Sequence, residues 1–179
     1  DYQLPLFQSM DSGTKRAVAI WHRRAGKDKS LLNLTIKKMF ERVGSYYYFF
    51  PTYAQGKKIL WDGIDASGMK FLAHFPNEVV LKKNDTEMKI ELKNGSMFQI
   101  VGTDNIDSIV GTNPVGCVFS EYALQSPLAW DMIRPILREN GGWAVFNFTP
   151  RGGNHGKDLY EMAKDNPDWF TQILSVKDT

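Results

Sequence analysis

The chain has 179 residues, of which 42% are hydrophobic and 23% charged, and its formal net charge is +2. This composition is typical of a folded globular domain, and the length is most simply that of one domain with a sizeable core. No apolar run approaches the roughly 18 residues that a membrane span needs, and the small net charge means that any contact with nucleic acid would depend on a local patch of Lys and Arg.

The first half of the chain alternates predicted strands and helices. Residues 16–22 form an apolar run that is rich in branched side chains, which predicts a buried strand. Apolar residues then recur at spacings of three and four over 28–43, which predicts an amphipathic helix. The aromatic run 45–50 is expected to be a second buried strand, because burial explains it more simply than stacking on nucleic-acid bases. A second helix is expected over 52–64, with Thr52 as its N-cap.

The second half begins with a different pattern. Apolar and polar residues alternate over 79–102 around the turn dipeptide Asn94-Gly95, which predicts an antiparallel hairpin or small meander at a sheet edge. Cys117, the single cysteine, lies in an apolar run and is expected to be a buried thiol rather than a nucleophile. The further predicted strands lie in the segments 114–123, 143–152 and 169–176. The further predicted helices are 127–140, where Pro135 is expected to cause a kink and Gly141 to end the helix, and 156–166.

This order of elements predicts an α/β fold with a mostly parallel central sheet flanked by helices, plus the antiparallel edge hairpin around residues 79–102. Ligands of such sheets bind outside the carboxyl ends of the strands. Three predicted strands end in unusual polar residues, namely the segments "RRAGKD", "SE" and "NFTPR". We therefore expect the functional site where these three segments meet.

The segment "HRRAGKD" resembles a phosphate-binding loop of the pattern G-x-x-x-x-G-K-[ST] with two substitutions. Trp21 stands at the first glycine and Asp28 at the hydroxyl position, whereas Gly26 and Lys27 fit. The strand before the loop and the helix after it favour an anion site over a basic solvated turn. The residues expected to bind phosphate are Arg23, Arg24, Ala25, Gly26, Lys27 and Asp28.

The other two strand ends supply candidate catalytic groups. Nucleotide hydrolases commonly end this strand in Asp-Glu, where the Asp serves Mg²⁺ and the Glu orients the attacking water. Here the pair is Ser120-Glu121, so Glu121 is the candidate for the water and Ser120 for a metal-bound water. Asp28 is a second candidate for Mg²⁺, and Ser30 is an alternative source of the missing hydroxyl. Thr149 is a candidate γ-phosphate sensor, although a glycine-rich turn after a core strand explains the same residues.

The ordered set "HRRAGKD", "VFSEYA" and "NFTPRGGNH" resembles the ATPase domain of phage large terminase subunits, the motors that pump viral DNA into procapsids. The resemblance implies a P-loop NTPase fold that uses ATP and Mg²⁺. It assigns Arg23 and Lys27 to the phosphates, Glu121 to catalysis and Thr149 to coupling. Gln3, in the upstream segment "DYQLPLFQ", is then the candidate reader of the adenine base. Asn154 and His155 match an extension of the coupling motif.

The resemblance also implies partners and a location. These are double-stranded DNA, portal protein, the small terminase subunit and a ring homo-oligomer, in the host cytoplasm and without a membrane. Residues 1–179 would be an isolated ATPase domain, part of a longer chain whose nuclease domain is absent here. Residues 103–114 contain no arginine to act in trans, so Arg134, Arg138 and Arg151 are the candidates for that role.

Two rival functions remain open from the sequence. One is a helicase-like or repair ATPase of the same nucleotide-binding fold, which would carry helicase motifs further downstream. The other is a degenerate module that binds nucleotide without hydrolysing it, and Ser120 and Asp28 are the residues that favour it. In the terminase interpretation, Ser120 replaces the usual metal-binding Asp, which makes Asp28 the expected source of its replacement.

Overall fold

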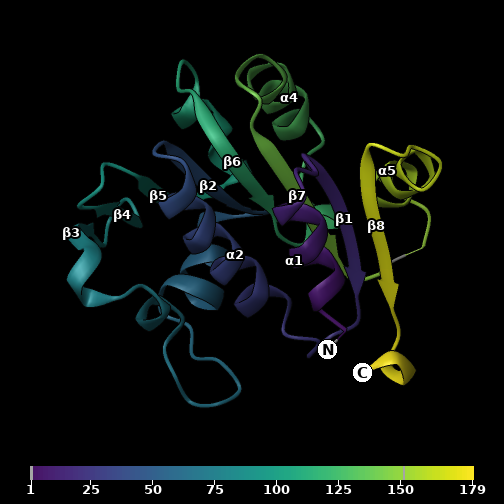
Figure 1. The fold of residues 1–179 in the computed structure, drawn as a ribbon, viewed down its shortest axis with the longest axis horizontal. Helices are drawn as coiled ribbons and strands as arrows, with labels where there is room; N and C mark the ends of the chain where they lie inside the picture. Colours follow the sequence, from purple (N-terminus) through teal and green to yellow (C-terminus); the bar gives the residue numbers. More distant parts are fainter. Residues whose placement is uncertain (1, 151) are drawn as a thin grey trace.

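The computed structural model describes residues 2–150 and 152–179. They form one eight-stranded sheet in the order β3-β4-β5-β2-β6-β7-β1-β8, with helices on both faces (Figure 1). The strands are β1 (Arg16–Trp21), β2 (Ser45–Phe50), β3 (Val80–Asn84), β4 (Lys89–Leu92), β5 (Met97–Gly102), β6 (Pro114–Phe119), β7 (Trp143–Phe148) and β8 (Trp169–Leu174). The helices are α1 (Leu4–Asp11), α2 (Lys27–Glu41), α3 (Tyr53–Gly56), α4 (Leu128–Asn140) and α5 (His155–Ala163).

The sheet is mostly parallel, as predicted. Strands β5, β2, β6, β7, β1 and β8 run in one direction, with β1 between β7 and β8 and with β6 between β2 and β7. Strand β4 pairs antiparallel with β3 on one side and with β5 on the other, so residues 79–102 form the predicted meander at one edge (Figure 1). The loops that follow β1, β6 and β7 therefore leave the same end of the sheet.

The alternation of side chains along each strand divides the core into two layers. One face of the sheet packs against α1 and α2, which cross in front of it in Figure 1, and the opposite face packs against α4 and α5. On this second face the rings of Phe49, Phe119 and Phe146 stack across β2, β6 and β7, with centroids 4.8 Å apart at both steps. Cys117 is buried on the same face, and burial raises the pKa of its thiol. The aromatic strand and the buried thiol are thus confirmed as core.

Two segments differ from the predicted elements. Residues 4–11 form α1, which the sequence analysis did not predict as a helix; its buried Leu6 and Met10 anchor it to the core. The helix predicted over 52–64 is α3 followed by a wider π-helical turn, Lys57–Trp61, within which the adjacent Leu60 and Trp61 are both buried. Thr52 does cap α3, accepting a hydrogen bond from the Gln55 amide at 3.1 Å.

The helix α4 runs through Pro135 to Asn140 and ends, as predicted, at Gly141, which adopts the left-handed conformation with φ 72°. Among the described residues, no helix is both long enough and apolar enough to cross a membrane.

Gly116, in the middle of β6, is a position where the core has no room for added volume. A Cβ atom there would lie 2.6 Å from ring atoms of both Trp143 and Tyr46, and neither buried ring has free space. We expect Gly116→Ala to lower the free energy of unfolding by about 1 to 3 kcal/mol, as overpacking of a core does. Urea denaturation measures this, with Gly153→Ala as control because none of the described residues has a non-neighbouring atom within 4 Å of its added Cβ. Equal stability of the two variants would contradict the tight packing.

Candidate functional site

The loop between β1 and α2 has the backbone geometry of an anion site. Arg24 and Gly26 both adopt the left-handed conformation, with φ of 67° and 72°, and Gly26 is the N-cap of the 15-residue α2. Alternation of left-handed residues at a helix start turns successive backbone N–H groups toward one concavity, where the helix dipole also favours negative charge. The loop can therefore hold phosphate oxygens even though Trp21, a buried core residue, replaces the first glycine.

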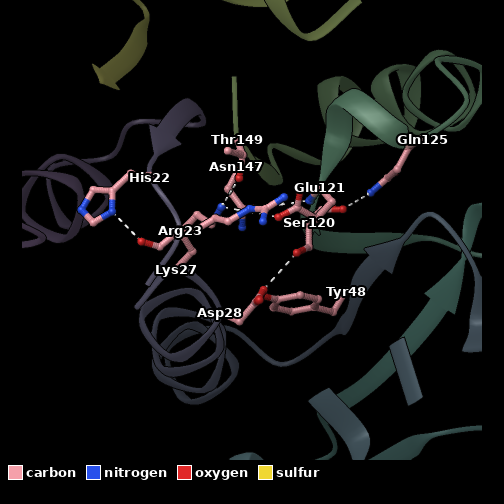
Figure 2. Close-up of polar contacts among 10 residues, drawn as sticks. All are labelled: His22, Arg23, Lys27, Asp28, Tyr48, Ser120, Glu121, Gln125, Asn147 and Thr149. Atoms are coloured by element: carbon pink, nitrogen blue, oxygen red, sulfur yellow. Dashed lines mark hydrogen bonds and ion pairs between the residues drawn. The ribbon is translucent and has the colours of Figure 1, made fainter. Parts of the chain in front are cut away.

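Lys27 connects the three predicted segments. Its side chain is only 9% exposed, and its Nζ donates to Thr149 Oγ1 at 2.9 Å and lies 3.4 Å from Glu121 Oε1 (Figure 2). The three residues come from the start of α2, the end of β6 and the end of β7. These direct contacts confirm that the three segments come together, as the sequence predicted.

Glu121 is held in an unusual backbone conformation. Its φ of 52° and ψ of 46° are left-handed, which costs a residue with a Cβ on the order of 1 to 2 kcal/mol. Gln125 supports this turn because its side-chain amide donates to Ser120 O at 2.7 Å and to Phe49 O at 3.1 Å, and Asn147 Oδ1 accepts from the Glu121 amide at 3.4 Å (Figure 2). Strained residues that are fixed in this way are typical of functional sites.

Asp28 and Ser120, the two residues that depart from the usual motifs, contact each other. Ser120 Oγ donates to Asp28 Oδ1 at 2.9 Å, and the hydroxyl of Tyr48 on β2 donates to the same oxygen at 2.6 Å (Figure 2). Burial raises the pKa of Asp28, while the two hydroxyl donors and the nearby Lys27 act in the opposite direction. Burial and Asp28 together raise the pKa of Tyr48 well above its usual value.

The remaining predicted ligands lie around the loop. Arg23 and Arg24 are exposed, and in Figure 2 the side chain of Arg23 extends from the loop toward the ends of β6 and β7. Gln3 packs on the loop, with its Nε2 donating to Ala25 O at 2.7 Å. The structure thus brings every predicted phosphate-binding and catalytic residue to the carboxyl end of the parallel sheet.

A cavity of 520 Å³ opens beside the loop, between residues 24–29 and residues 64–71. Asp65 fastens its far wall: this carboxylate accepts hydrogen bonds from Ser67 and Met69 and lies 3.5 Å from Lys29 Nζ. His74 Nε2 lies 3.3 Å from the same carboxylate. No sequence pattern indicates this wall, since neither Asp65 nor its partners stand in a motif.

The extension of the coupling motif has a structural role in this arrangement. Asn154 caps α5 by accepting from the amides of Gly156 and Lys157. His155 Nε2 lies 2.7 Å from Tyr122 O, in the turn that follows Glu121.

Three arginines, Arg134, Arg138 and Arg151, are the candidates for a trans-acting role. Arg134 and Arg138 are exposed on α4, and Arg151 lies outside the described residues. Within the described part of the chain, no three His, Cys, Asp or Glu side chains gather to hold a metal.

No protein-family model matches the chain, but its sequence is similar to that of a known phage protein. It is 29% identical over 176 residues to the large terminase subunit of Escherichia phage T5. The similarity covers 94% of this chain but only 39% of the T5 protein, so the chain spans well under half of that relative. The resemblance to phage large terminase subunits that the motifs indicated is therefore confirmed.

Solved structures of terminases share the fold. The ATPase domain of the large terminase of Thermus phage P74-26 superposes with a TM-score of 0.80 and 20% identity, covering 99% of this chain and 81% of that one. The large terminase of a second thermophilic bacteriophage, solved in complex with ADP, superposes with a TM-score of 0.79 and 15% identity, covering 99% of this chain and 46% of that one. The prediction of an α/β fold with a mostly parallel sheet flanked by helices is thus confirmed, and this fold matches that of terminase ATPase domains.

Proposed function

We propose that the 179 residues are the ATPase domain of a phage large terminase subunit, in which ATP hydrolysis drives double-stranded viral DNA into a procapsid. The observation that carries the proposal is the joint contact of Lys27 with Glu121 and Thr149 at the mouth of the phosphate loop. The similarity to the T5 protein favours DNA packaging over a helicase-like or repair ATPase of the same fold.

The phosphate loop binds the triphosphate through charge and backbone donors. The amides of residues 25–28 converge on the anion site, Lys27 supplies a point charge, and Arg23 and Arg24 supply planar guanidinium groups suited to phosphate oxygens. Such positioning accounts for most of the catalysis of phosphoryl transfer, because the protein forms no covalent bond to the phosphoryl group.

The donors around Asp28 fit a hard divalent cation. Asp28 and Ser120 supply oxygen atoms, which Mg²⁺ prefers, and Asp28 Oδ2 receives no hydrogen bond from the described residues. Bound there, Mg²⁺ would neutralise charge on the β- and γ-phosphate oxygens. The residues proposed to form this metal site are Asp28 and Ser120.

Glu121 and Thr149 act on the γ-phosphate end. Glu121 orients the attacking water and accepts its proton as the bond to phosphorus forms. Thr149, whose Oγ1 accepts a hydrogen bond from Lys27 Nζ at 2.9 Å, changes its contacts when the γ-phosphate leaves. We infer that this change is relayed from β7 to the elements that grip DNA.

The proposal extends to the assembled motor. In it the domain acts within a ring of identical subunits, together with portal protein and the small terminase subunit, in the host cytoplasm. The remainder of the relative's length, outside the matched 39%, would supply the other activities of the subunit.

Calorimetric titration with ATP and Mg²⁺ tests the nucleotide site, and we expect saturable binding at one site per chain. Release of phosphate is expected to rise when double-stranded DNA is added and to lose this stimulation at high salt, because phosphate contacts to Lys and Arg are salt-dependent. Absence of nucleotide binding would overturn the proposed function. Binding without turnover, with or without DNA, would instead favour the degenerate module.

Gln3 is proposed to read the adenine base, since it already lies on the loop. We expect Gln3→Ala to lower the preference for ATP over GTP by about tenfold, the loss of one buried hydrogen bond to the base. Competition of unlabelled ATP and GTP against a fluorescent ATP analogue measures the preference. Gln8→Ala, an exposed position on α1, is the matched control. An unchanged preference in the Gln3 variant would show that another residue reads the base.

A further inference from the structure

The two departures from the usual nucleotide-binding motifs are complementary. In P-loop NTPases a hydroxyl follows the loop lysine and a carboxylate ends the neighbouring strand, and both serve Mg²⁺. Here the carboxylate of Asp28 follows Lys27, and the hydroxyl of Ser120 ends β6. The site therefore holds the usual set of one carboxylate and one hydroxyl. Each of the two groups, however, lies on the element that carries the other group in the usual motifs.

The geometry joins these two departures into one unit. Ser120 Oγ donates to Asp28 Oδ1 at 2.9 Å across 92 positions of sequence, so the exchanged groups touch (Figure 2). Tyr48 donates to the same oxygen from β2. With two hydroxyls fixing Oδ1, the plane of the carboxylate is set, and Oδ2 receives no hydrogen bond from the described residues.

Burial separates the roles of the two residues. Ser120 is 1% exposed, whereas Asp28 is only partly buried and lines the 520 Å³ cavity together with Gly26 and Lys27 of the phosphate loop. A divalent cation held at the phosphate loop would thus reach Asp28 and be screened from the Ser120 hydroxyl.

We propose that the carboxylate and hydroxyl of the magnesium site have exchanged elements, so that Asp28 is the direct protein ligand and Ser120 is its positioning partner. The inference rests on the proposed function and deepens it. Each single reversion, Asp28→Ser or Ser120→Asp, is then expected to bind Mg²⁺ more weakly than the double reversion. Two hydroxyls leave the ion without an anionic ligand, and two carboxylates in contact repel each other.

The test compares the affinity for a fluorescent, non-hydrolysable ATP analogue in Mg²⁺ with that in EDTA, a ratio that we call the metal enhancement. We expect Asp28→Ser to lower the metal enhancement by about 100-fold, because direct and supporting ligand groups each contribute 10- to 100-fold to metal affinity. Ser120→Asp alone is also expected to lower the metal enhancement, to below that of the double variant. The double variant Asp28→Ser/Ser120→Asp is expected to return to within about tenfold of the parent. Asp28→Asn, which keeps the size of the side chain, is expected to behave as Asp28→Ser and decides the outcome if the double variant does not fold.

Affinity in EDTA distinguishes the two possible failures. If the parent binds no nucleotide in either condition, the proposed function fails. If the parent binds with metal enhancement and Asp28→Ser and Asp28→Asn keep that enhancement, the exchange is wrong while the function stands. A folded double variant no better than Asp28→Ser would likewise overturn the exchange. Thermal melting of each variant establishes that it is folded.

Discussion

Replacing Glu121 with glutamine is expected to lower ATP turnover at least 100-fold while ATP still binds. A positioned general base contributes roughly 10²- to 10⁴-fold, and glutamine keeps the size of the side chain but cannot take the proton of water. The left-handed backbone of Glu121 and its support by Gln125 and Asn147 persist in this variant, since none of those contacts uses the carboxylate. Phosphate release measures turnover, and fluorescence titration with labelled ATP measures binding.

The control for Glu121→Gln is Glu139→Gln on α4, which removes the same charge from an exposed position. It is expected to hydrolyse ATP at the parent rate. If Glu121→Gln also turned over ATP at the parent rate, Glu121 would not be the base, and the strained turn that presents it would need another explanation.

Replacing Lys27 with alanine is expected to lower nucleotide affinity by about 100-fold or more, because a buried charged hydrogen bond to phosphate contributes roughly 1.5 to 3 kcal/mol and Lys27 can form more than one. Turnover falls with it. The variant also leaves Glu121 without its neighbouring cation, so the nucleotide-free domain changes as well. Calorimetry with ATP measures the affinity directly.

Lys29→Ala is the matched control for Lys27→Ala. It removes the same charge two residues along α2, from a side chain that is 48% exposed and faces Asp65 instead of Glu121. We expect a much smaller loss of affinity. Equal losses in the two variants would mean that the loop attracts nucleotide by its overall charge and that Lys27 has no special position.

The sequence predicted most of the fold because its periodic segments are long and its buried strands are uniform. The edge meander was predictable from the alternation of apolar and polar residues around Asn94-Gly95. The end of α4 was predictable because Gly141 adopts the left-handed conformation that ends a helix. The helix α1 was not predicted because residues 2–11 were interpreted as a base-binding segment around Gln3. That interpretation rests on single residues and not on the spacing of the apolar ones. The π-helical turn after α3 had no signal, since local propensity does not distinguish it from an ordinary helix.

Site residues that stand at a strand end could be predicted from the sequence. Those that contact the site from distant parts of the chain could not. Glu121, Lys27 and Thr149 could be located because parallel strands end at one edge. Tyr48 lies in a run of aromatic residues in which every second ring faces α2, and only that face, combined with Asp28 in the first turn of α2, could have indicated their contact. Gln125 and Asp65 depend on how loops fold back, for which one sequence carries no pattern.

The stacked rings of Phe49, Phe119 and Phe146 have a mechanical consequence. They lie beneath the ends of three neighbouring strands, two of which present Glu121 and Thr149. Sliding one strand past another would separate rings packed 4.8 Å apart in a close-packed interior, which resists deformation. The sheet is therefore expected to stay rigid, and in the proposed function any movement would fall on the loops and helices around it.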